Sequence, residues 1–210
     1  MTPALGQPTV VDLYFDPVCP YAWIVSRWLA VVAVHRPLQV RHHLMSLAIL
    51  NEGARQSAAY LANVERTTGP SRVFAAAAVH IGEGILSDLY TAFGTPWFAR
   101  WRLPDPDDLT TALQTALTAV RLPAGFAQAA HTSAYDAALR ESHSRGVADL
   151  GPHAGTPILH INDVPWFGPV LNAVPEQQAA LDLYDSLLVL TRHPDFCELK
   201  RPRTQLPRLE

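Results

Sequence analysis

The spacing of apolar residues near the start of the chain predicts a β-α-β unit. Thr9–Phe15 is rich in β-branched and aromatic residues and is followed by an Asp-Pro pair, which predicts a buried strand entering a turn. From Cys19 onward, apolar residues recur at helical spacing until a break near Pro37, which predicts a helix. Leu38–Leu47 then alternates well enough for a second strand. The length of the intervening segment suits a crossover between two parallel strands.

The middle of the chain, from Ala54 to Gly146, is rich in alanine and helical in pattern. Three prolines can each occupy the first position of a helix, where proline is favoured: Pro70, Pro106 and Pro123. Asp105 can cap the helix that would begin at residue 106. Ser133 with Asp136 resembles a capping box, and the glycine at 146 can end that helix. We therefore expect residues 54–146 to form an all-helical insertion.

Strand character returns after the segment GPHAGTP. Ile158–Ile161 predicts a short strand, Asn162–Asp163 a tight turn and Val164–Phe167 a further strand, so this region predicts an antiparallel hairpin. Helical spacing then resumes before a tail that contains Pro and Arg. The order β-α-β, helices, β-β-α predicts an α/β fold in which residues 1–53 and 147–210 form one domain around the insertion.

Composition places the chain among folded globular proteins. Of its 210 residues, 49% are hydrophobic and 17% are charged, which is enough apolar material for a well-packed domain. The formal net charge is -3 and the sequence has no basic stripe with interleaved aromatics, so we expect no nucleic-acid partner. No apolar run approaches the length of a membrane span, and no basic leader precedes an apolar core. We therefore expect a cytoplasmic protein with no membrane partner.

The two cysteines, Cys19 and Cys197, lie near opposite ends of the chain. Their spacing is neither that of metal ligands nor that of a secreted disulfide scaffold. His42 and His43 are neighbours on a predicted strand and therefore point to opposite faces, which does not suit a shared metal. We expect no metal site, and Cys19 is then either a reactive thiol or an inert one.

Cys19 stands where a predicted helix begins. A thiol in the first turn of a helix faces unpaired backbone N–H groups and the positive end of the helix dipole, and both stabilise the thiolate. The sulfur would then be a nucleophile near neutral pH. The alternative is that Cys19 is a small buried apolar residue, which is the usual fate of an isolated cysteine. Its placement alone leaves both interpretations open.

Five segments spread over the chain resemble one family of proteins. In chain order they are FDPVCPYAW, MSLAILNE (Met45–Glu52), GTPILHIN (Gly155–Asn162), FGPVL (Phe167–Leu171) and ELKRPRT (Glu198–Thr204). Together they resemble the DsbA-like thioredoxin-fold proteins, and within these the mycothiol-dependent nitroreductase-like branch of actinobacteria. The resemblance implies a thioredoxin fold, made of β-α-β and β-β-α halves, with an inserted all-helical subdomain.

The active motif of that family is Cys-Pro-Trp-Cys, and the sequence CPYA, beginning at Cys19, stands in its place. The resemblance implies that Cys19 and Pro20 keep the catalytic position, while the resolving cysteine is absent. It also implies that Pro157 is a cis proline packed beside the sulfur, a feature uncommon enough to be informative. Thr156 would offer backbone groups to an extended thiol substrate. The co-substrate that the family implies is a thiol such as mycothiol or glutathione.

The residue that replaces the resolving cysteine is Ala22. A site with two cysteines resolves its mixed disulfide internally, whereas a site with one must wait for an external thiol or never form a disulfide. Cys197 is not expected to take over this step, because the family carries an aromatic residue there and nothing places Cys197 near the helix start. An alanine is also what a substitution made to trap an intermediate would leave, whereas Tyr21 in place of Trp indicates natural divergence.

Further residues could contact a substrate. Tyr21 lies within the motif, and Asn51 and Tyr60 could line a cleft between the thioredoxin-like part and the helices. His153 precedes Pro157 closely and could approach the sulfur, with a solvated loop histidine as the alternative. Two other aromatics are expected to belong to the core: Trp97 and Trp101. The basic residues of the tail are expected to be solvated: Lys200, Arg201, Arg203 and Arg208.

Three functions are consistent with these observations. The leading hypothesis is a monothiol oxidoreductase in which the Cys19 thiolate acts on a small-molecule substrate together with a low-molecular-weight thiol such as mycothiol. The second is a non-redox, thiol-dependent transferase or isomerase of the kappa transferase or chromene-carboxylate isomerase type, for which one thiol suffices. The third is a non-enzymatic family member that binds a ligand. The substrate and the oligomeric state stay open, and a homodimer is among the states allowed.

Overall fold

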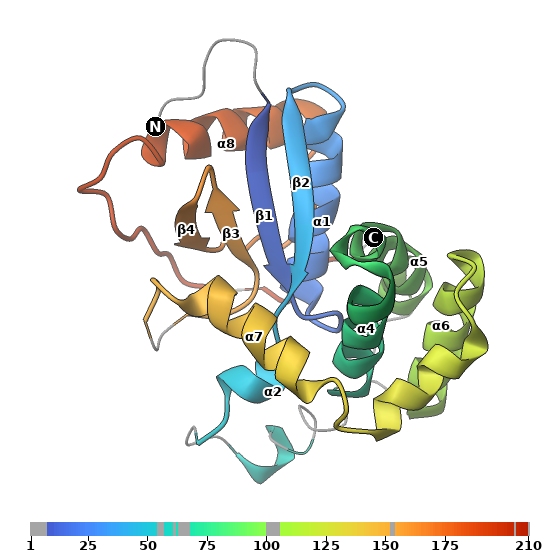
Figure 1. Ribbon diagram of the computed structural model, residues 1–210. Coiled ribbons are helices and arrows are strands. Elements are labelled where there is room, and N and C mark those ends of the chain that lie inside the picture. The colour runs from blue at the N-terminus through green and yellow to red at the C-terminus, as the bar shows by residue number, and fades with distance from the viewer. Residues whose placement is uncertain are drawn as a thin grey trace.

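The computed structural model describes residues 8–53, 57–60, 62, 68–99, 106–151, 154–203 and 205–209. A four-stranded sheet stands at its centre, with helices on both faces (Figure 1). The strands are β1 (Thr9–Phe15), β2 (Leu38–Leu44), β3 (Ile158–Ile161) and β4 (Val164–Phe167). The predicted α/β class is confirmed.

The strands lie side by side in the order β2-β1-β3-β4. β1 and β2 are parallel, which confirms the predicted crossover pair. β3 runs antiparallel to β1, with Tyr14 opposite Ile158, and antiparallel to β4. The turn between β3 and β4 holds Asn162 and Asp163 at φ of 48° and 68°, the positive values that a two-residue hairpin turn of this kind requires. The predicted hairpin is therefore confirmed.

The central strand β1 is covered on both faces. α1 (Pro20–Ala33) and α8 (Gln177–Leu190) lie behind the sheet in Figure 1, and α7 (Asp136–Val147) lies in front of it. α1 and α8 are joined by a hydrogen bond of 2.9 Å, in which Nε1 of Trp28 donates to the carbonyl oxygen of Ala180. Both faces of β1 are therefore covered, and nearly all of the strand is buried.

The described part of the chain between β2 and β3 is helical. Its segments are α2 (Leu47–Leu50), α4 (Thr68–Ile81), η1 (Glu83–Ile85), α5 (Leu86–Ala99), α6 (Pro106–Ala119), η2 (Ala124–His131) and α7. At the carboxyl end of β1, the ring of Phe15 stacks on Tyr90 of α5 with centroids 4.0 Å apart and meets Phe74 of α4 edge-on at 6.0 Å. One continuous apolar core therefore joins the sheet to these helices.

Some predicted boundaries differ from the structure. β2 ends at Leu44, three residues before the predicted end. Pro106 begins α6 as predicted, whereas Pro70 lies inside the first turn of α4 and Pro123 precedes η2. Asp105 lies outside the described residues. Within the described ranges, no helix combines the length and apolar character that a membrane span needs.

The predicted capping box of Ser133 and Asp136 is wrong. α7 begins at Asp136 itself, and its N-cap residue is Tyr135, which makes no side-chain capping bond. Arg72 of α4 binds both carboxylate oxygens of Asp136, at 2.7 and 2.8 Å. The carboxylate is therefore used to join α4 to α7 rather than to cap a helix.

Candidate active site at Cys19

Cys19 follows the carboxyl end of β1 in a tight turn. The carbonyl oxygen of Asp16 accepts a hydrogen bond from the N–H of Cys19 at 3.0 Å, and Oδ1 of Asp16 accepts one from the N–H of Val18 at 3.0 Å. Cys19 is the N-cap residue of α1, with φ of -78° and ψ of 117°, and Pro20 occupies the first helical position. The turn therefore fixes the thiol at the amino end of α1.

The segment before β3 lies against the sulfur. The Thr156–Pro157 peptide bond is cis, and Sγ of Cys19 donates a weak hydrogen bond to the carbonyl oxygen of Thr156 at 3.7 Å. β3 brings this segment close because it pairs with β1. Gly155 also has no room for a side chain, since a Cβ there would lie 2.7 Å from the ring of Phe167. Cys19, Thr156 and Pro157 therefore share one site.

Burial changes the expected ionisation of Cys19. Only 4% of the residue is exposed. Burial, together with the negative charge of Asp16, raises the pKa of the thiol to about 12, although the backbone N–H groups of Ala22 and Tyr21 and the contact with Thr156 act in the opposite direction. The prediction of a stabilised thiolate is therefore wrong for this conformation: the helix start favours the anion as expected, but the loss of water around the sulfur outweighs it.

Asp16 is a buried carboxyl group next to this site. Its Oδ1 accepts the Val18 N–H, and its Oδ2 accepts the N–H of Leu47 at 2.7 Å, so it ties the turn before α1 to the start of α2. Burial raises the pKa of Asp16 to about 6, against the two backbone hydrogen bonds, which lower it. The sequence shows Asp16 only as part of a turn, because its burial depends on α2.

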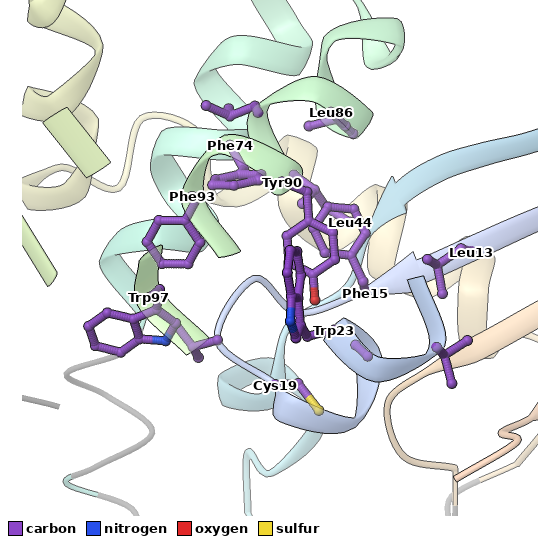
Figure 2. Close-up of a cluster of buried hydrophobic side chains, with 14 of the residues drawn as sticks. Leu13, Phe15, Cys19, Trp23, Leu44, Phe74, Leu86, Tyr90, Phe93 and Trp97 are labelled. Atoms are coloured by element: carbon purple, nitrogen blue, oxygen red, sulfur yellow. The ribbon is translucent and has the colours of Figure 1, made fainter. Parts of the chain in front are cut away.

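Aromatic side chains from α1 and the helical insertion gather next to Cys19 in one buried apolar cluster (Figure 2). Trp23 of α1 is 6% exposed, and its ring meets Tyr90 edge-on at 5.4 Å and stacks on Phe98 at 5.3 Å. Tyr90 is fully buried. The sequence did not single out Tyr90, because it lies 71 positions after Cys19 within a helix of ordinary amphipathic pattern. These rings make the environment of the thiol apolar.

Tyr21 lies at the partly exposed edge of the site. Its side chain packs against the main core, and the guanidinium carbon of Arg203 lies 5.5 Å from the centre of its ring. Arg203 is exposed and belongs to the tail that follows α8. Arg203 is therefore exposed, as expected for the tail, and in addition forms a cation–π contact with Tyr21 of the motif.

Asn51 and Tyr60 contact each other near α2. The side-chain amide of Asn51 donates to the carbonyl oxygen of Leu47 at 2.7 Å and to the hydroxyl oxygen of Tyr60 at 3.4 Å. Tyr60 is 38% exposed. Since Asp16 binds the N–H of Leu47, α2 connects this pair to the turn that carries Cys19. Asn51 and Tyr60, two of the predicted substrate-binding residues, therefore lie together at the end of α2 and in the segment after it.

The remaining candidates divide into described and undescribed residues. His153 and Trp101 lie outside the described residues. Trp97 is 7% exposed and stacks on Phe93 with centroids 5.8 Å apart, so the prediction that it belongs to the core is confirmed. Cys197 is exposed, and neither cysteine forms a disulfide.

The two adjacent histidines of β2 point to opposite faces of the sheet, as predicted. His42 meets the ring of Phe15 edge-on at 5.8 Å, and burial lowers its pKa to about 4. His43 stacks on Tyr14, and its ring nitrogens lie 2.7 Å from Asp12 and 2.8 Å from Glu83. Among the described residues, no group of three or more His, Cys, Asp or Glu side chains is arranged to hold a metal ion.

Known proteins resemble this chain over most of its length. Residues 18–201 match the model of the Rv2466c-like family, described as mycothiol-dependent nitroreductase Rv2466c. The uncharacterized protein Rv2286c of Mycobacterium tuberculosis (strain ATCC 25618 / H37Rv) is 27% identical over 198 residues, which cover 93% of this chain and 83% of that protein.

Solved structures share the fold at lower identity. The structure of a 2-hydroxychromene-2-carboxylate isomerase has a TM-score of 0.54 at 16% identity, covering 87% of this chain and 96% of that one. A probable DsbA oxidoreductase, SCO1869 from Streptomyces coelicolor, has a TM-score of 0.50 at 15% identity, covering 93% and 94%. These similarities support the thioredoxin fold of the DsbA-like proteins. Because the family match extends over most of the chain, including the turn that carries Cys19, this protein belongs to the Rv2466c-like family.

Proposed function

We propose that this protein is a monothiol oxidoreductase in which Cys19 exchanges disulfides between a small-molecule substrate and a low-molecular-weight thiol. The observation that carries the proposal is the contact of Sγ with the Thr156 carbonyl oxygen beside the cis bond to Pro157. With the sulfur beside the backbone of Thr156 and Pro157, a thiol compound can bind next to this segment while it reacts with Cys19. The description of the family as mycothiol-dependent supports mycothiol as the thiol, with glutathione as an alternative.

The exchange can be written with a balanced pair of steps. The Cys19 thiolate attacks one sulfur of a disulfide, the S–S bond breaks, and the departing thiolate takes the electron pair and a proton. A second thiolate then attacks the sulfur of the group bound to Cys19 and forms a new disulfide with that group. The bond to Cys19 breaks, and the Cys19 sulfur keeps the electron pair and takes up a proton. Since Ala22 offers no internal thiol and is itself fully buried, the second step must use an external thiol.

The raised pKa of Cys19 sets the rate of the first step. A thiol whose pKa is about 12 is almost entirely protonated at neutral pH, so the thiolate fraction limits attack. Below that pKa, each unit of pH raises the thiolate fraction about tenfold. Exchange at Cys19 should therefore accelerate steeply with pH.

The remaining parts of the proposal concern substrate binding and location. Tyr21, Asn51 and Tyr60 contact the substrate, and His153 belongs to the same group of candidates. The division into a thioredoxin-like domain, residues 1–53 and 147–210, and a helical insertion, residues 54–146, is also part of this proposal. We place the protein in the cytoplasm, where low-molecular-weight thiols keep cysteines reduced.

The test is mass spectrometry after treatment with mycothiol disulfide or glutathione disulfide. In a Cys197→Ser background, which removes the exposed second thiol, we expect one adduct on Cys19, removed by excess reduced thiol, that forms about tenfold faster for each pH unit between 7 and 9. Cys19→Ser in the same background should lose this adduct. An unmodified Cys19 in the native protein would contradict the proposal.

A second candidate function is a thiol-dependent transferase or isomerase. The neutral state of Cys19 and the absence of a thiol at residue 22 favour it, because a reaction that forms no disulfide needs neither a stable thiolate nor a resolving cysteine. The measurement that separates the two is electron balance during turnover. Turnover without consumption of reducing equivalents would favour this candidate, and ligand binding that survives Cys19→Ser without any turnover would favour a non-enzymatic role.

A further inference from the structure

The hydroxyl group of Tyr90 is a buried polar group without a partner. Tyr90 lies on α5 and is 0% exposed. Its Oη forms no hydrogen bond with any described residue. An unpaired buried hydroxyl lowers the stability of a fold relative to an apolar ring of the same shape, so a phenylalanine would fill this position better if packing alone mattered.

The ring of Tyr90 is held firmly in place. It stacks on Phe15 with centroids 4.0 Å apart and planes 22° from parallel, and Trp23 meets it edge-on at 5.4 Å. Phe74 closes a third side at 6.4 Å. Three neighbouring rings prevent the phenol from swinging toward solvent, so the direction of its hydroxyl is fixed by the core.

This direction is toward the site of Cys19. Figure 2 shows the Tyr90 oxygen at the end of the ring that faces the start of α1, where Cys19 lies, whereas the Cys19 sulfur points away from this ring. The electrostatic influence of the two groups agrees with this placement: burial raises the pKa of Tyr90 well above its ordinary value, and charge on Cys19 and Asp16 raises it further, while Arg27 acts in the opposite direction. The phenol therefore stays protonated and remains a hydrogen-bond donor.

In the resting state the phenol binds no acceptor among the described residues. The neutral thiol of Cys19 uses its proton to contact the Thr156 carbonyl oxygen at 3.7 Å. Once that proton leaves, the sulfur can no longer donate to a carbonyl oxygen and instead needs donors. Among the described residues, Tyr90 and Thr156 both have buried hydroxyls without a partner. Thr156 contacts the sulfur through its carbonyl oxygen, and charge on Cys19 acts on the pKa of Tyr90.

We propose that the Tyr90 hydroxyl donates a hydrogen bond to the Cys19 sulfur whenever that sulfur is negatively charged, both as the attacking thiolate and as the group that leaves when the mixed disulfide is reduced. This inference rests on the proposed function, because only a reaction at Cys19 generates that charge. The phenol keeps its proton throughout, and the electron pair of the broken S–S bond stays on the sulfur. The contact requires the Cys19 side chain to turn from Thr156 toward Tyr90.

The test compares Tyr90→Phe with Tyr184→Phe, each in a Cys197→Ser background. Tyr184 is another buried tyrosine, located on α8 against Trp28, and serves as the matched control. The readout is the rate of Cys19 alkylation by iodoacetamide at a fixed pH between 8 and 9. Loss of a hydrogen bond to a charged acceptor raises a thiol pKa by about one to two units, so Tyr90→Phe should slow alkylation about three- to tenfold, allowing for the higher nucleophilicity of a more basic thiolate. Tyr184→Phe should leave the rate unchanged.

Thermal unfolding of the same proteins separates this role from a structural one. We expect the melting temperature of Tyr90→Phe to stay equal to that of the unsubstituted protein or to rise, because an unpaired buried hydroxyl is removed. A fall in melting temperature with an unchanged alkylation rate would overturn the inference, since the hydroxyl would then serve the fold alone. An alkylation rate that does not change in Tyr90→Phe would overturn it whatever the stability.

A second variant keeps the inference testable if Tyr90→Phe does not fold. A fluorinated tyrosine placed at residue 90 has a more acidic phenol and is a stronger donor, so Cys19 should be alkylated faster; an equal or slower rate would contradict the inference. Alkylation needs no disulfide substrate. If Cys19 forms no mixed disulfide but its alkylation still depends on Tyr90, the proposed function fails while the hydrogen bond stands.

Discussion

At the scale of single residues, burial raises the pKa of both Asp16 and Cys19, yet the two groups differ in charge at neutral pH. Burial raises the pKa of the Cys19 thiol to about 12 and that of the Asp16 carboxyl to about 6. Backbone N–H groups favour the anion of both residues, but the pKa of a carboxyl group starts from 3.8 and that of a thiol from 9.0. At neutral pH, Asp16 is therefore mainly charged and Cys19 is neutral.

The raised pKa of Asp16 predicts a pH-dependent loss of stability. Between its ordinary value of 3.8 and about 6, the folded state holds a proton that the unfolded state has lost, so the free energy of unfolding falls as pH rises through this window. The full difference corresponds to about 3 kcal/mol. We expect Asp16→Asn, which cannot ionise, to gain stability relative to the natural protein between pH 4 and pH 6.5.

Urea unfolding at several pH values measures this difference. Other carboxyl groups titrate equally in both proteins, including Asp12, whose pKa is lowered to about 2 by hydrogen bonds and charge from His43 and Arg41 despite its burial, so their contributions cancel. A difference in stability that stays constant with pH would show that Asp16 ionises normally in the folded protein.

At the scale of the elements, local signals in the sequence were enough to predict the framework of the site. The β-branched run of β1, the turn at Asn162 and the helical spacing of α1 each appear within a few residues and agree with the structure. The burial of Cys19 could not be predicted in this way, because it depends on side chains such as Tyr90 that reach the site from a distant helix. The prediction that Asp136 takes part in a capping box was wrong for the same reason, since Arg72 binds its carboxylate from α4.

The contact between α1 and α5 predicts the effect of one added methyl group. A Cβ at Gly94 would lie 2.3 Å from the ring of Trp23, which must then move. We expect Gly94→Ala to lower the free energy of unfolding by about 1 to 3 kcal/mol, because the overpacked ring cannot shift without disturbing its stacking on Phe98. Urea unfolding is the measurement.

Gly84→Ala is the matched control, because a Cβ at Gly84 meets nothing within 4 Å. It should change the stability by less than about 0.5 kcal/mol. Equal effects of the two substitutions would mean that Trp23 does not pack against Gly94 in solution.

At the scale of the whole molecule, one apolar core connects the sheet with the helices of the insertion. Phe74 of α4 is fully buried and meets Phe15 of β1 at 6.0 Å and Phe93 of α5 at 5.8 Å. Such shared contacts make separate unfolding of the sheet and the helices unfavourable, since either part would expose the rings of the other. We infer that the described parts of the chain unfold together.

Phe74→Ala tests this cooperativity. We expect it to destabilise the protein by about 3 to 5 kcal/mol and to shift the unfolding curves from circular dichroism and tryptophan fluorescence by the same amount. Val79→Ala, on the same helix but at a position that is 54% exposed, should have little effect. Two separate transitions in Phe74→Ala would show that the helices and the sheet unfold independently.

The contact between the Cys19 sulfur and the Thr156 carbonyl oxygen spans 137 positions of the chain. During synthesis, Cys19 leaves the ribosome long before the loop that contacts it, and β3 can join β1 only after the helical segments have emerged. A nascent or truncated chain that stops before residue 156 therefore carries the cysteine without its site. The site proposed at Cys19 can therefore form only after the residues of β3 have been made.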